Sequence, residues 1–424
     1  MKKLLTKLRI SFRIDSDYFV KNGFFVFLNH FIQIFFNFIL SIFLARYLTK
    51  VDFGKWQFVM ALIGASYIFS LPGMNISIMQ SVAKKETENV FSGIKWRLIG
   101  SLVGSIVILL SSFYPLFYHK DVSLTIILFL TALIFPFYSS YESIFSYFMA
   151  KKEFLTSLKL QSTLKFFSTT LAILFLAYGF NLIIILTSYL FSIALIQFLF
   201  YYFYVKKFQK IQVNNQNNKK SDSNNKQRFD SISKYGIQLS VLNIITLLPG
   251  YLDKILTPVL LGSEALANYA IAMTVPDFFN GLMKPMMILV FPKIADFSKE
   301  KIGAILKSKI KLIILLTLSS IILNILLSEL IPFVFGQKYG DVVLMSSFMS
   351  LSLISLLVYP LVLSYVNINK MLKSIGLMNA WLGIVNSVGT LIFVWLFGIW
   401  GVVIVYIIRQ PVAALLGIIA SSKR

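Results

Sequence analysis

The chain contains no cysteine and only two histidines, His30 and His119. Without cysteine it cannot form disulfides, thiolate metal sites or a cysteine nucleophile. No His-Glu-x-x-His zinc motif, no phosphate-binding Gly-x-x-x-x-Gly-Lys-Ser/Thr loop and no Gly-x-Ser-x-Gly nucleophile motif occurs. These absences leave an ATP-driven pump, a zinc enzyme and a serine hydrolase without support. We therefore expect neither a cofactor nor a metal ion.

Charged residues are also scarce, and hydrophobic residues take their place. Only 13% of the 424 residues are charged, 57% are hydrophobic, and the mean hydropathy is +0.79. This composition is typical of a polytopic membrane protein. The net charge is +23, and the lysines and arginines that produce it lie mostly beside the hydrophobic runs. We therefore expect these residues to contact anionic membrane lipids, and we do not expect nucleic acid as a partner.

Hydrophobic runs of helical length follow one another along the whole chain. Each is long enough to cross about 30 Å of hydrocarbon at about 1.5 Å per residue. We place twelve of them at residues 22–48, 54–82, 94–116, 122–149, 157–179, 181–205, 233–261, 265–292, 308–335, 341–367, 374–397 and 399–421. The expected fold is therefore an all-α membrane protein with about twelve transmembrane helices.

Most of the forty lysines and arginines lie in alternate gaps between these runs. The basic gaps are the N-terminus to Lys21, Lys84 to Arg97, Lys151 to Lys165, Lys206 to Lys234, Lys293 to Lys311, Lys370 to Lys373 and the C-terminus. The intervening gaps hold only Arg46, Lys50, Lys55, Lys120 and Lys338. Because cytoplasmic loops retain lysine and arginine, both termini are predicted to be cytoplasmic.

The same pattern divides the chain into four parts. Residues 1–21 are predicted to form a basic helix on the inner leaflet, because leucines and a phenylalanine share one stripe among lysines and arginines. Residues 22–205 would form a first lobe of six spans and residues 233–424 a second one. Residues 206–232 are rich in asparagine and lysine and lack apolar periodicity, so we expect a solvated cytoplasmic linker there.

Several ionisable side chains lie inside or at the end of predicted spans. They are His30, Arg46, Glu142, Asp253, Lys254, Asp277, Lys284 and Arg409. A charge at the bilayer centre costs about 2.5–3.5 kcal/mol by insertion scales, so these groups are expected to face the protein interior. They either line a solvated substrate cavity or form buried pairs, such as Lys284 with Asp277, seven residues apart on one helix face. Arg46 lies near a span end and could instead extend to the interface.

Proline and glycine interrupt three of the spans. The positions are Pro72 and Gly73 in the second span, Pro249 and Gly250 in the seventh, and Pro276 and Pro285 in the eighth. A proline removes one backbone donor and leaves a carbonyl unsatisfied, which favours a kink beside a water-filled cavity. These positions are hinge candidates, although each one alone could be an ordinary packing kink.

Short blocks in both lobes resemble the polysaccharide-export (O-antigen) flippases of the multidrug/oligosaccharidyl-lipid/polysaccharide exporter superfamily. The blocks are LARYLTKVDFG at residues 44–54, LDKI at 252–255, LGSEA at 261–265, YA at 269–270, FPKIA at 291–295 and FGQKY at 335–339. They occur in family order and cover the first two spans and spans seven to ten. The chain departs from the family pattern at residues 266–268, where LAN replaces the frequent Val-Gly-Tyr.

The resemblance implies a V-shaped pair of six-helix bundles that opens a central cavity to either face in turn, as in multidrug exporters. It also implies a location in the bacterial cytoplasmic membrane, and an undecaprenyl-diphosphate-linked oligosaccharide as substrate. Other polysaccharide-assembly proteins would be possible partners. Lys254, Arg409, Lys284 and Arg46 would then bind the diphosphate. Asp253, Asp277, Glu142 and His30 would hold these cations in place or couple transport to an ion.

Two other functions fit parts of the sequence. A multidrug exporter of the same superfamily would favour cationic drugs through unpaired carboxylates, and the first lobe offers only Glu142 deep in a span. A membrane glycan polymerase or ligase is an enzyme that generally needs a long outer loop, whereas the predicted outer loops here are very short. A transporter is therefore expected.

Overall fold

The computed structural model describes residues 16–83, 89–206, 234–241, 243–244, 247–295, 299–368 and 371–422. The first lobe contains α2 (Ser16–Tyr47), α3 (Lys50–Ser66), η1 (Tyr67–Ser70), α4 (Met74–Ala83), α5 (Asn89–Ser111), η2 (Pro115–His119), α6 (Val122–Ser140), α7 (Ser143–Ala150), α8 (Phe154–Ala177), α9 (Leu182–Phe200) and η3 (Tyr201–Lys206). The second contains α12 (Pro249–Leu261), α13 (Ser263–Ala295), α14 (Lys299–Ser328), α15 (Ile331–Phe335), η4 (Gln337–Tyr339), α16 (Val342–Met349), η5 (Ser350–Ser355), α17 (Val358–Ile368), α18 (Leu372–Ile384), η6 (Val385–Gly389), α19 (Thr390–Phe397) and α20 (Ile399–Ser422). The described residues are almost entirely helical, as the hydrophobic runs predict.

Eight helices in the described part of the chain are long and apolar enough to span a membrane. A ninth span is formed if Lys50–Ser70 and Met74–Ala83, which bend by 52° at their junction, count as one broken helix. The other three predicted spans correspond to α12, α13 and α14. The membrane-spanning fold is confirmed, whereas the count of twelve spans is not.

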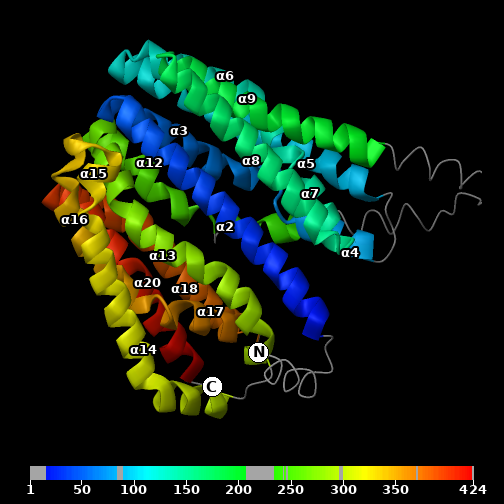
Figure 1. The fold of residues 1–424 in the computed structure, drawn as a ribbon, viewed down its shortest axis with the longest axis vertical. Coiled ribbons are helices and arrows are strands. Elements are labelled where there is room, and N and C mark those ends of the chain that lie inside the picture. The colour runs from blue at the N-terminus through cyan, green and yellow to red at the C-terminus, as the bar shows by residue number, and fades with distance from the viewer. Residues whose placement is uncertain are drawn as a thin grey trace, which may run out of the picture.

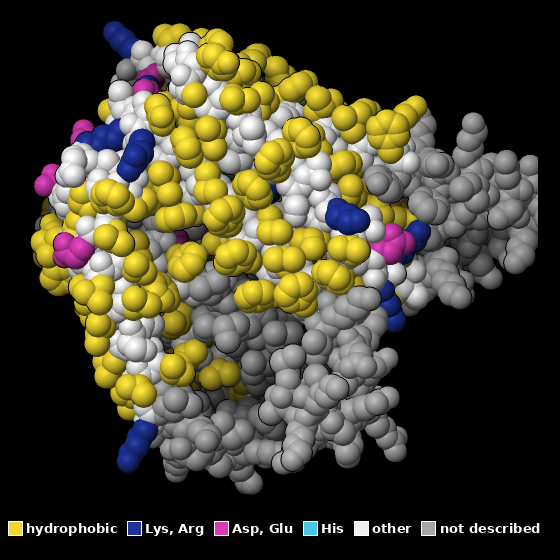
Figure 2. All heavy atoms as spheres, viewed as in Figure 1, with side chains coloured by type: hydrophobic (Ala, Val, Ile, Leu, Met, Phe, Trp, Pro, Cys, Tyr) yellow, Lys and Arg dark blue, Asp and Glu magenta, His cyan; other side chains and the backbone are white. Residues whose placement is uncertain are grey.

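The two lobes form a V (Figure 1). They converge at the end that carries α15 and the α2–α3 turn, which we call the closed end. They diverge toward the end that carries the start of α2 and the end of α20, which we call the open end (Figure 1). Hydrophobic side chains cover much of the face shown in Figure 2, and charged groups gather mainly near its edges. This distribution suits a protein whose flanks contact lipid.

Very tight turns connect helices at the closed end. Gly262 joins α12 to α13 by a single residue and has φ +86°, a conformation that glycine adopts without a steric penalty. Gly179 (φ +74°) lies in the short turn between α8 and α9, and the Asn181 side chain accepts a hydrogen bond from the Ile184 amide at the start of α9. Short turns leave no room for an added domain at these positions.

Cross-lobe contacts seal the closed end. Lys50 of α3 pairs with Glu264 of α13 at 3.4 Å, and Lys338 donates to the Leu48 carbonyl. Gly54 packs so tightly against the other lobe that a Cβ would lie 1.8 Å from the Ser263 carbonyl oxygen. Glycine is therefore required at this crossing of α3 and α13.

Aromatic rings add to this seal. Phe53 meets Tyr339 edge to face at 6.4 Å, and Phe38 meets Phe335 at 5.9 Å, each pair joining the two lobes. Burial and the nearby Lys50 lower the pKa of Lys338. The closed end is thus a continuous packed layer that would have to separate before a ligand could leave through it.

Part of the predicted organisation lies outside the described residues. The basic helix at residues 1–21 falls there except for its last six positions, whose backbone belongs to α2. The linker at residues 206–232 also falls there, apart from the final residue of η3. Both remain predictions.

Candidate functional site

A buried network of charges and tyrosines holds the second lobe together. Arg409 of α20 pairs with the fully buried Asp253 of α12 at 3.3 Å, and the Tyr269 hydroxyl donates to the same carboxylate at 2.6 Å. The Arg409 guanidinium also lies over the Tyr406 ring, 4.2 Å from its centroid. In turn, the Tyr406 hydroxyl donates to Asp277 at 2.8 Å. Arg409 is therefore neutralised by a carboxylate 156 positions away.

Lys254 is the neighbour of Asp253 in sequence, but its side chain has a different environment. It lines a cavity of about 420 Å³ between the lobes. The walls are Ile34, Asn37, Phe38, Leu40, Ser41 and Leu44 of α2, Trp56, Gln57 and Met60 of α3, Tyr189 of α9, Lys254 of α12, and Ala270, Met273, Thr274, Asp277 and Phe278 of α13. Among the described residues, the Lys254 ammonium has no hydrogen-bond or ion-pair partner. We call this space the central cavity.

Lys165 of α8 brings a second cation to this region. Its ammonium donates to the side-chain Oδ1 atom of Asn37 at 3.0 Å and to the Tyr189 hydroxyl at 3.2 Å. Both acceptors are uncharged and both line the central cavity. The positive charge of Lys165 is therefore held at the cavity wall without a carboxylate partner among the described residues.

The sequence interpretation missed Lys165 and Arg97, which it assigned to cytoplasmic gaps. In the structure α5 begins at Asn89 and α8 at Phe154, and both cations lie inside these spans. They also lie inside the predicted spans 94–116 and 157–179, although the charge pattern counts them with the basic gaps before them. Hydropathy alone could have flagged them, because apolar residues flank Arg97 and Lys165 on the N-terminal as well as the C-terminal side.

A second polar cavity, of about 320 Å³, lies within the first lobe. It is lined by Gln33, Ile63, Gly64, Tyr67, Tyr138, Glu142, Phe145, Gln161, Leu164, Lys165, Ile193, Gln197 and Tyr251. All except Tyr251, which comes from α12, belong to the first lobe. We call it the amide cavity, after its three glutamines. Lys165 lines it, and the acceptors of Lys165 line the central cavity, so the two spaces adjoin at this side chain.

Arg97 supports one wall of the amide cavity. It is fully buried and donates to Ser70, Asn75, Ser139 and Ser143, which tie α5 to η1, α4, α6 and α7. Glu142 lies 3.7 Å from the guanidinium, and its side chain is 42% exposed. Arg97 thus offsets part of the charge of Glu142 while leaving the carboxylate open to the cavity.

The remaining predicted cations lie elsewhere. The Arg46 guanidinium donates to the carbonyls of Val334 (2.7 Å) and Phe333 in α15, so it joins the lobes at the closed end instead of lining the central cavity. The Lys284 side chain lies outside the described residues, and its suggested pairing with Asp277 is untested. His30 lies in α2, has an interaction partner of its own, and does not line either polar cavity.

The hinge candidates differ in structure. The second span breaks at Pro72 and Gly73, where Leu71 has φ +55° and the helix changes direction by 52°. Pro249 and Gly250 begin α12. Pro276 and Pro285 both lie within the single helix α13. A backbone break is thus seen at Pro72 and Gly73, and hinge motion remains a prediction for all six positions.

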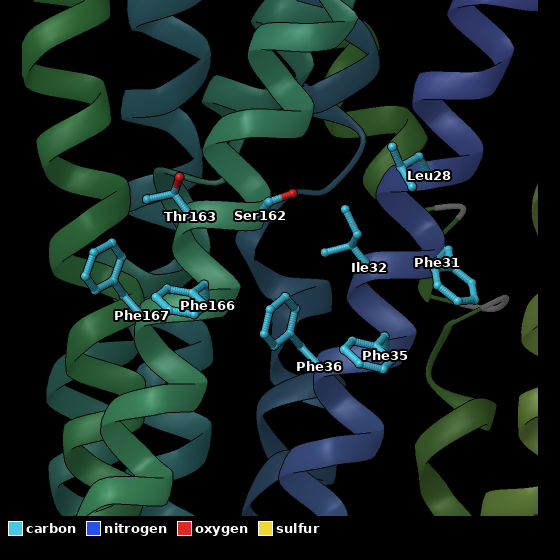
Figure 3. A pocket seen from close by; sticks show the side chains of 9 residues that line it. All are labelled: Leu28, Phe31, Ile32, Phe35, Phe36, Ser162, Thr163, Phe166 and Phe167. Atoms are coloured by element: carbon cyan, nitrogen blue, oxygen red, sulfur yellow. The ribbon is translucent and has the colours of Figure 1, made fainter.

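An apolar groove of about 550 Å³ lies between α2 and α8 (Figure 3). It is lined by other residues of these two helices than those that line the polar cavities. Phe31, Phe35, Phe36, Phe166 and Phe167 supply most of its lining. It suits hydrocarbon and not a charged ligand. Among the described residues there is no cluster of three or more histidines and carboxylates that could hold a metal ion.

Solved structures that match this fold include multidrug resistance transporters. One is titled an inward-facing conformation of a multidrug resistance MATE family transporter of the MOP superfamily. It matches with a TM-score of 0.65 at 14% identity, over 92% of this chain and 93% of the other. The outward-facing conformation of such a transporter matches with a TM-score of 0.62 at 14% identity, over 96% and 95%. A MATE structure in a bent conformation gives 0.55 at 15% identity, over 96% and 94%.

These likenesses establish the fold alone, and they confirm the predicted V-shaped, multidrug-transporter-like architecture. Compared with curated proteins, the chain has no significant sequence match. The family model described as polysaccharide biosynthesis protein matches residues 19–298, about two thirds of the chain. The chain therefore belongs to the polysaccharide biosynthesis protein family, and its fold is similar to that of the MATE transporters above.

Proposed function

We propose that the protein is a flippase that moves a polyprenyl-diphosphate-linked oligosaccharide across the bacterial cytoplasmic membrane for surface polysaccharide synthesis. The Lys254 ammonium carries the proposal, because it lines a cavity between two lobes and lacks a partner among the described residues. An intramembrane cation without a counterion is costly unless water or a ligand meets it. A diphosphate supplies several strong acceptor oxygens for such a group.

Lys165 supports the same site from the first lobe. Its two present acceptors are uncharged, so an anionic oxygen could replace either of them with a stronger hydrogen bond. Lys254 comes from the second lobe, and a ligand bound to both cations would contact both halves of the V. Such a ligand is placed where relative motion of the lobes can change its affinity.

Arg409 and Arg46 take other roles in this proposal. Arg409 stays with Asp253 and contributes to the shape and potential of the site. Arg46 stabilises the closed end through the α15 carbonyls. Asp277 lines the central cavity but is held by Tyr406, which favours a positioning role or an ion-coupling role over direct contact with an anion.

The V shape is consistent with a conformation that takes up its substrate from the cytoplasmic side. If the termini are cytoplasmic, as the charge pattern predicts, the lobes diverge toward the cytoplasm and the closed end faces outward (Figure 1). Opening the closed end and closing the other would carry the head group across, while the polyprenyl chain stays in lipid. An inside-negative potential of 100 mV favours outward movement of two negative charges by at most about 4.6 kcal/mol.

The test is transfer of a fluorescent polyprenyl-diphosphate oligosaccharide between leaflets of proteoliposomes. We expect transfer by the wild type, a loss of at least tenfold for Lys254→Gln and for Lys165→Gln, and partial activity for Lys254→Arg. Lys159→Gln is the matched control, because Lys159 is exposed on the same helix α8. Normal transfer by the Lys254→Gln, Lys165→Gln double variant would show that the assigned anion site is wrong.

The same vesicles separate the rival functions. A multidrug exporter would move a cationic dye and ignore the lipid-linked sugar. A polymerase or ligase would lengthen the glycan, which is visible as a change in product size. Either result, without leaflet transfer, would replace the flippase proposal.

A further inference from the structure

The amide cavity contains a buried polar atom that no described residue satisfies. Gln197 of α9 is only 5% exposed, and its Oε1 atom has no hydrogen-bond partner in the described part of the chain. Gln197 lines the cavity. An unpaired buried amide oxygen costs about 1–3 kcal/mol, so such a group in a native protein calls for an explanation. A ligand that donates a hydrogen bond into the cavity would provide one.

The other polar groups of the cavity define the chemistry of that ligand. Glu142 presents a partly exposed carboxylate, and Gln33 adds an amide. The Gln161 Nε2 atom donates to the Ser157 hydroxyl at 3.0 Å, which leaves the Gln161 amide oxygen as an acceptor. The set is therefore rich in acceptors. It suits a ligand with several hydroxyl donors.

The charged residues around the amide cavity disfavour both a simple anion and a simple cation as its ligand. An anion in the amide cavity would meet Glu142, and a cation would meet Lys165 and the nearby Arg97. A neutral polyhydroxylated group avoids both repulsions. Tyr67, Tyr138 and Tyr251 supply flat, amphipathic surfaces next to these acceptors.

From these observations we infer that the amide cavity is a sugar subsite, which binds the sugar next to the diphosphate. The inference rests on the proposed flippase function. Lys165 joins the two cavities, so a diphosphate held near Lys165 and Lys254 places its first sugar at the mouth of the amide cavity. Gln197 and Glu142 accept hydrogen bonds from its hydroxyl groups.

The sugar subsite depends on the relative position of the two lobes, because Tyr251 completes its lining from the second lobe. It belongs to α12 of the second lobe, and its ring lies where Gly64 of α3 leaves space: a Cβ on Gly64 would lie 2.2 Å from the ring. The sugar subsite is thus complete only while α12 and α3 keep this arrangement. A sugar bound to Tyr251 and Gln197 together would favour the present state over one in which the lobes have shifted.

The first measurement uses free sugars, so that it does not depend on transport. Saturation-transfer NMR with lactose, maltose and diacetylchitobiose tests binding to the purified full-length protein. We expect a signal from at least one of them with the wild type and its loss in Gln197→Leu. Gln80→Leu, at an exposed position on α4, is the matched control and should keep the signal. No signal with the wild type, or an equal signal in Gln197→Leu, would overturn the subsite.

The second measurement compares two lipids, a short-chain polyprenyl diphosphate with and without a disaccharide. Gln197→Leu should weaken binding of the sugar-bearing lipid about tenfold and leave the sugar-free lipid unchanged. Equal weakening of both would assign Gln197 to the anion site or to the fold and overturn the inference. If the wild type binds neither lipid but binds a free sugar through Gln197, the flippase proposal fails and the sugar subsite stands.

The melting temperature separates ligand binding from folding. Because Gln197→Leu removes an unsatisfied buried oxygen, the variant should melt at the same temperature as the wild type or higher. A clear drop in melting temperature would show that Gln197 is needed for packing and would overturn its assignment to a ligand.

Discussion

Two adjacent residues, Asp253 and Lys254, have opposite surroundings. Asp253 is fully buried and bound by Arg409 and Tyr269, whereas Lys254 lines the central cavity. Their side chains leave α12 about 100° apart, so neighbours in sequence face different sides of the helix. Charge type alone therefore does not tell which cation binds a ligand and which one stabilises the fold.

Substitution of Arg409 should lower the stability of the protein, whereas substitution of Lys254 should not. Arg409→Gln leaves the Asp253 carboxylate buried without its cation, which costs about 3–5 kcal/mol. Lys254→Gln removes a charge that has no partner among the described residues and should leave stability unchanged. Melting temperatures in detergent check this, and the Arg409→Gln, Asp253→Asn double variant should recover much of the loss. A stable Arg409→Gln protein would contradict the structural role of this pair.

At the scale of single elements, helix ends depend on local side chains. The Asp121 carboxylate caps α6 by accepting the Leu124 amide at 3.1 Å, and it pairs with Lys55 at 2.6 Å. Burial alone would raise the pKa of Asp121, but the hydrogen bonds from Lys55 and Leu124 outweigh it and lower the pKa. A lowered carboxylate pKa stabilises the fold above the unfolded-state pKa of about 3.9.

Asp121→Asn should therefore reduce stability in a pH-dependent way. Near neutral pH we expect a loss of about 1 kcal/mol, the usual size of a helix-cap contribution, because the carboxylate is only partly buried and solvent weakens its ion pair. The difference from the wild type should shrink as the pH falls below about 4 and the native carboxylate becomes protonated. Melting curves across this pH range check it, and a difference that does not vary with pH would contradict the charged role of the cap.

Two glycines among the hinge candidates can be compared directly, Gly73 at the break of the second span and Gly250 at the start of α12. A Cβ on Gly73 would lie 2.5 Å from the Gly236 carbonyl oxygen and 2.6 Å from the Ser240 amide nitrogen. A Cβ on Gly250 would meet nothing within 4 Å. The same small substitution therefore has opposite consequences at the two positions.

Gly73→Ala should destabilise the protein by about 1–3 kcal/mol, because backbone atoms of the other lobe must move. Gly250→Ala should be neutral or stabilise by up to about 1 kcal/mol, because alanine favours the helix. Melting temperature and leaflet transfer report both effects. If Gly250→Ala abolishes transfer without changing stability, Gly250 is a hinge; if it does not, the hinge prediction at this position is wrong.

At the scale of the whole molecule, the closed end decides which face of the cavity is accessible. Its cross-lobe contacts include Lys50 with Glu264, Lys338 with Leu48, and Arg46 with α15. The chain has no cysteine, so introduced thiols can be cross-linked without background. A covalent bridge across the lobes would hold the present conformation.

Joining Lys50→Cys to Glu264→Cys with a reducible bifunctional thiol reagent should stop transfer, and reduction should restore it. Joining Lys55→Cys to Asp121→Cys, which are paired at the same end but within one lobe, is the control and should leave transfer largely intact. Undiminished transfer through a fully cross-linked Lys50–Glu264 pair would mean that this end does not open during transport.

The membrane class, the helical fold and the family could be predicted from the order of the amino acids alone. Apolar runs must form helices in lipid because every backbone group needs a partner within the segment, so this information is local. The short blocks around Arg46 and Lys254 pointed to the family, which the match over residues 19–298 confirms.

The role of each charged side chain became visible only from the packing of the helices. Arg409 meets Asp253 across 156 positions, Lys165 reaches Asn37 across 128, and Arg46 reaches α15 across 288. None of these pairings follows from helical periodicity, because they depend on how separate helices pack against one another. Long-range packing thus separates the Lys254 and Lys165 cations, which border the cavities, from Arg409, Arg97 and Arg46, which the protein uses to hold itself together.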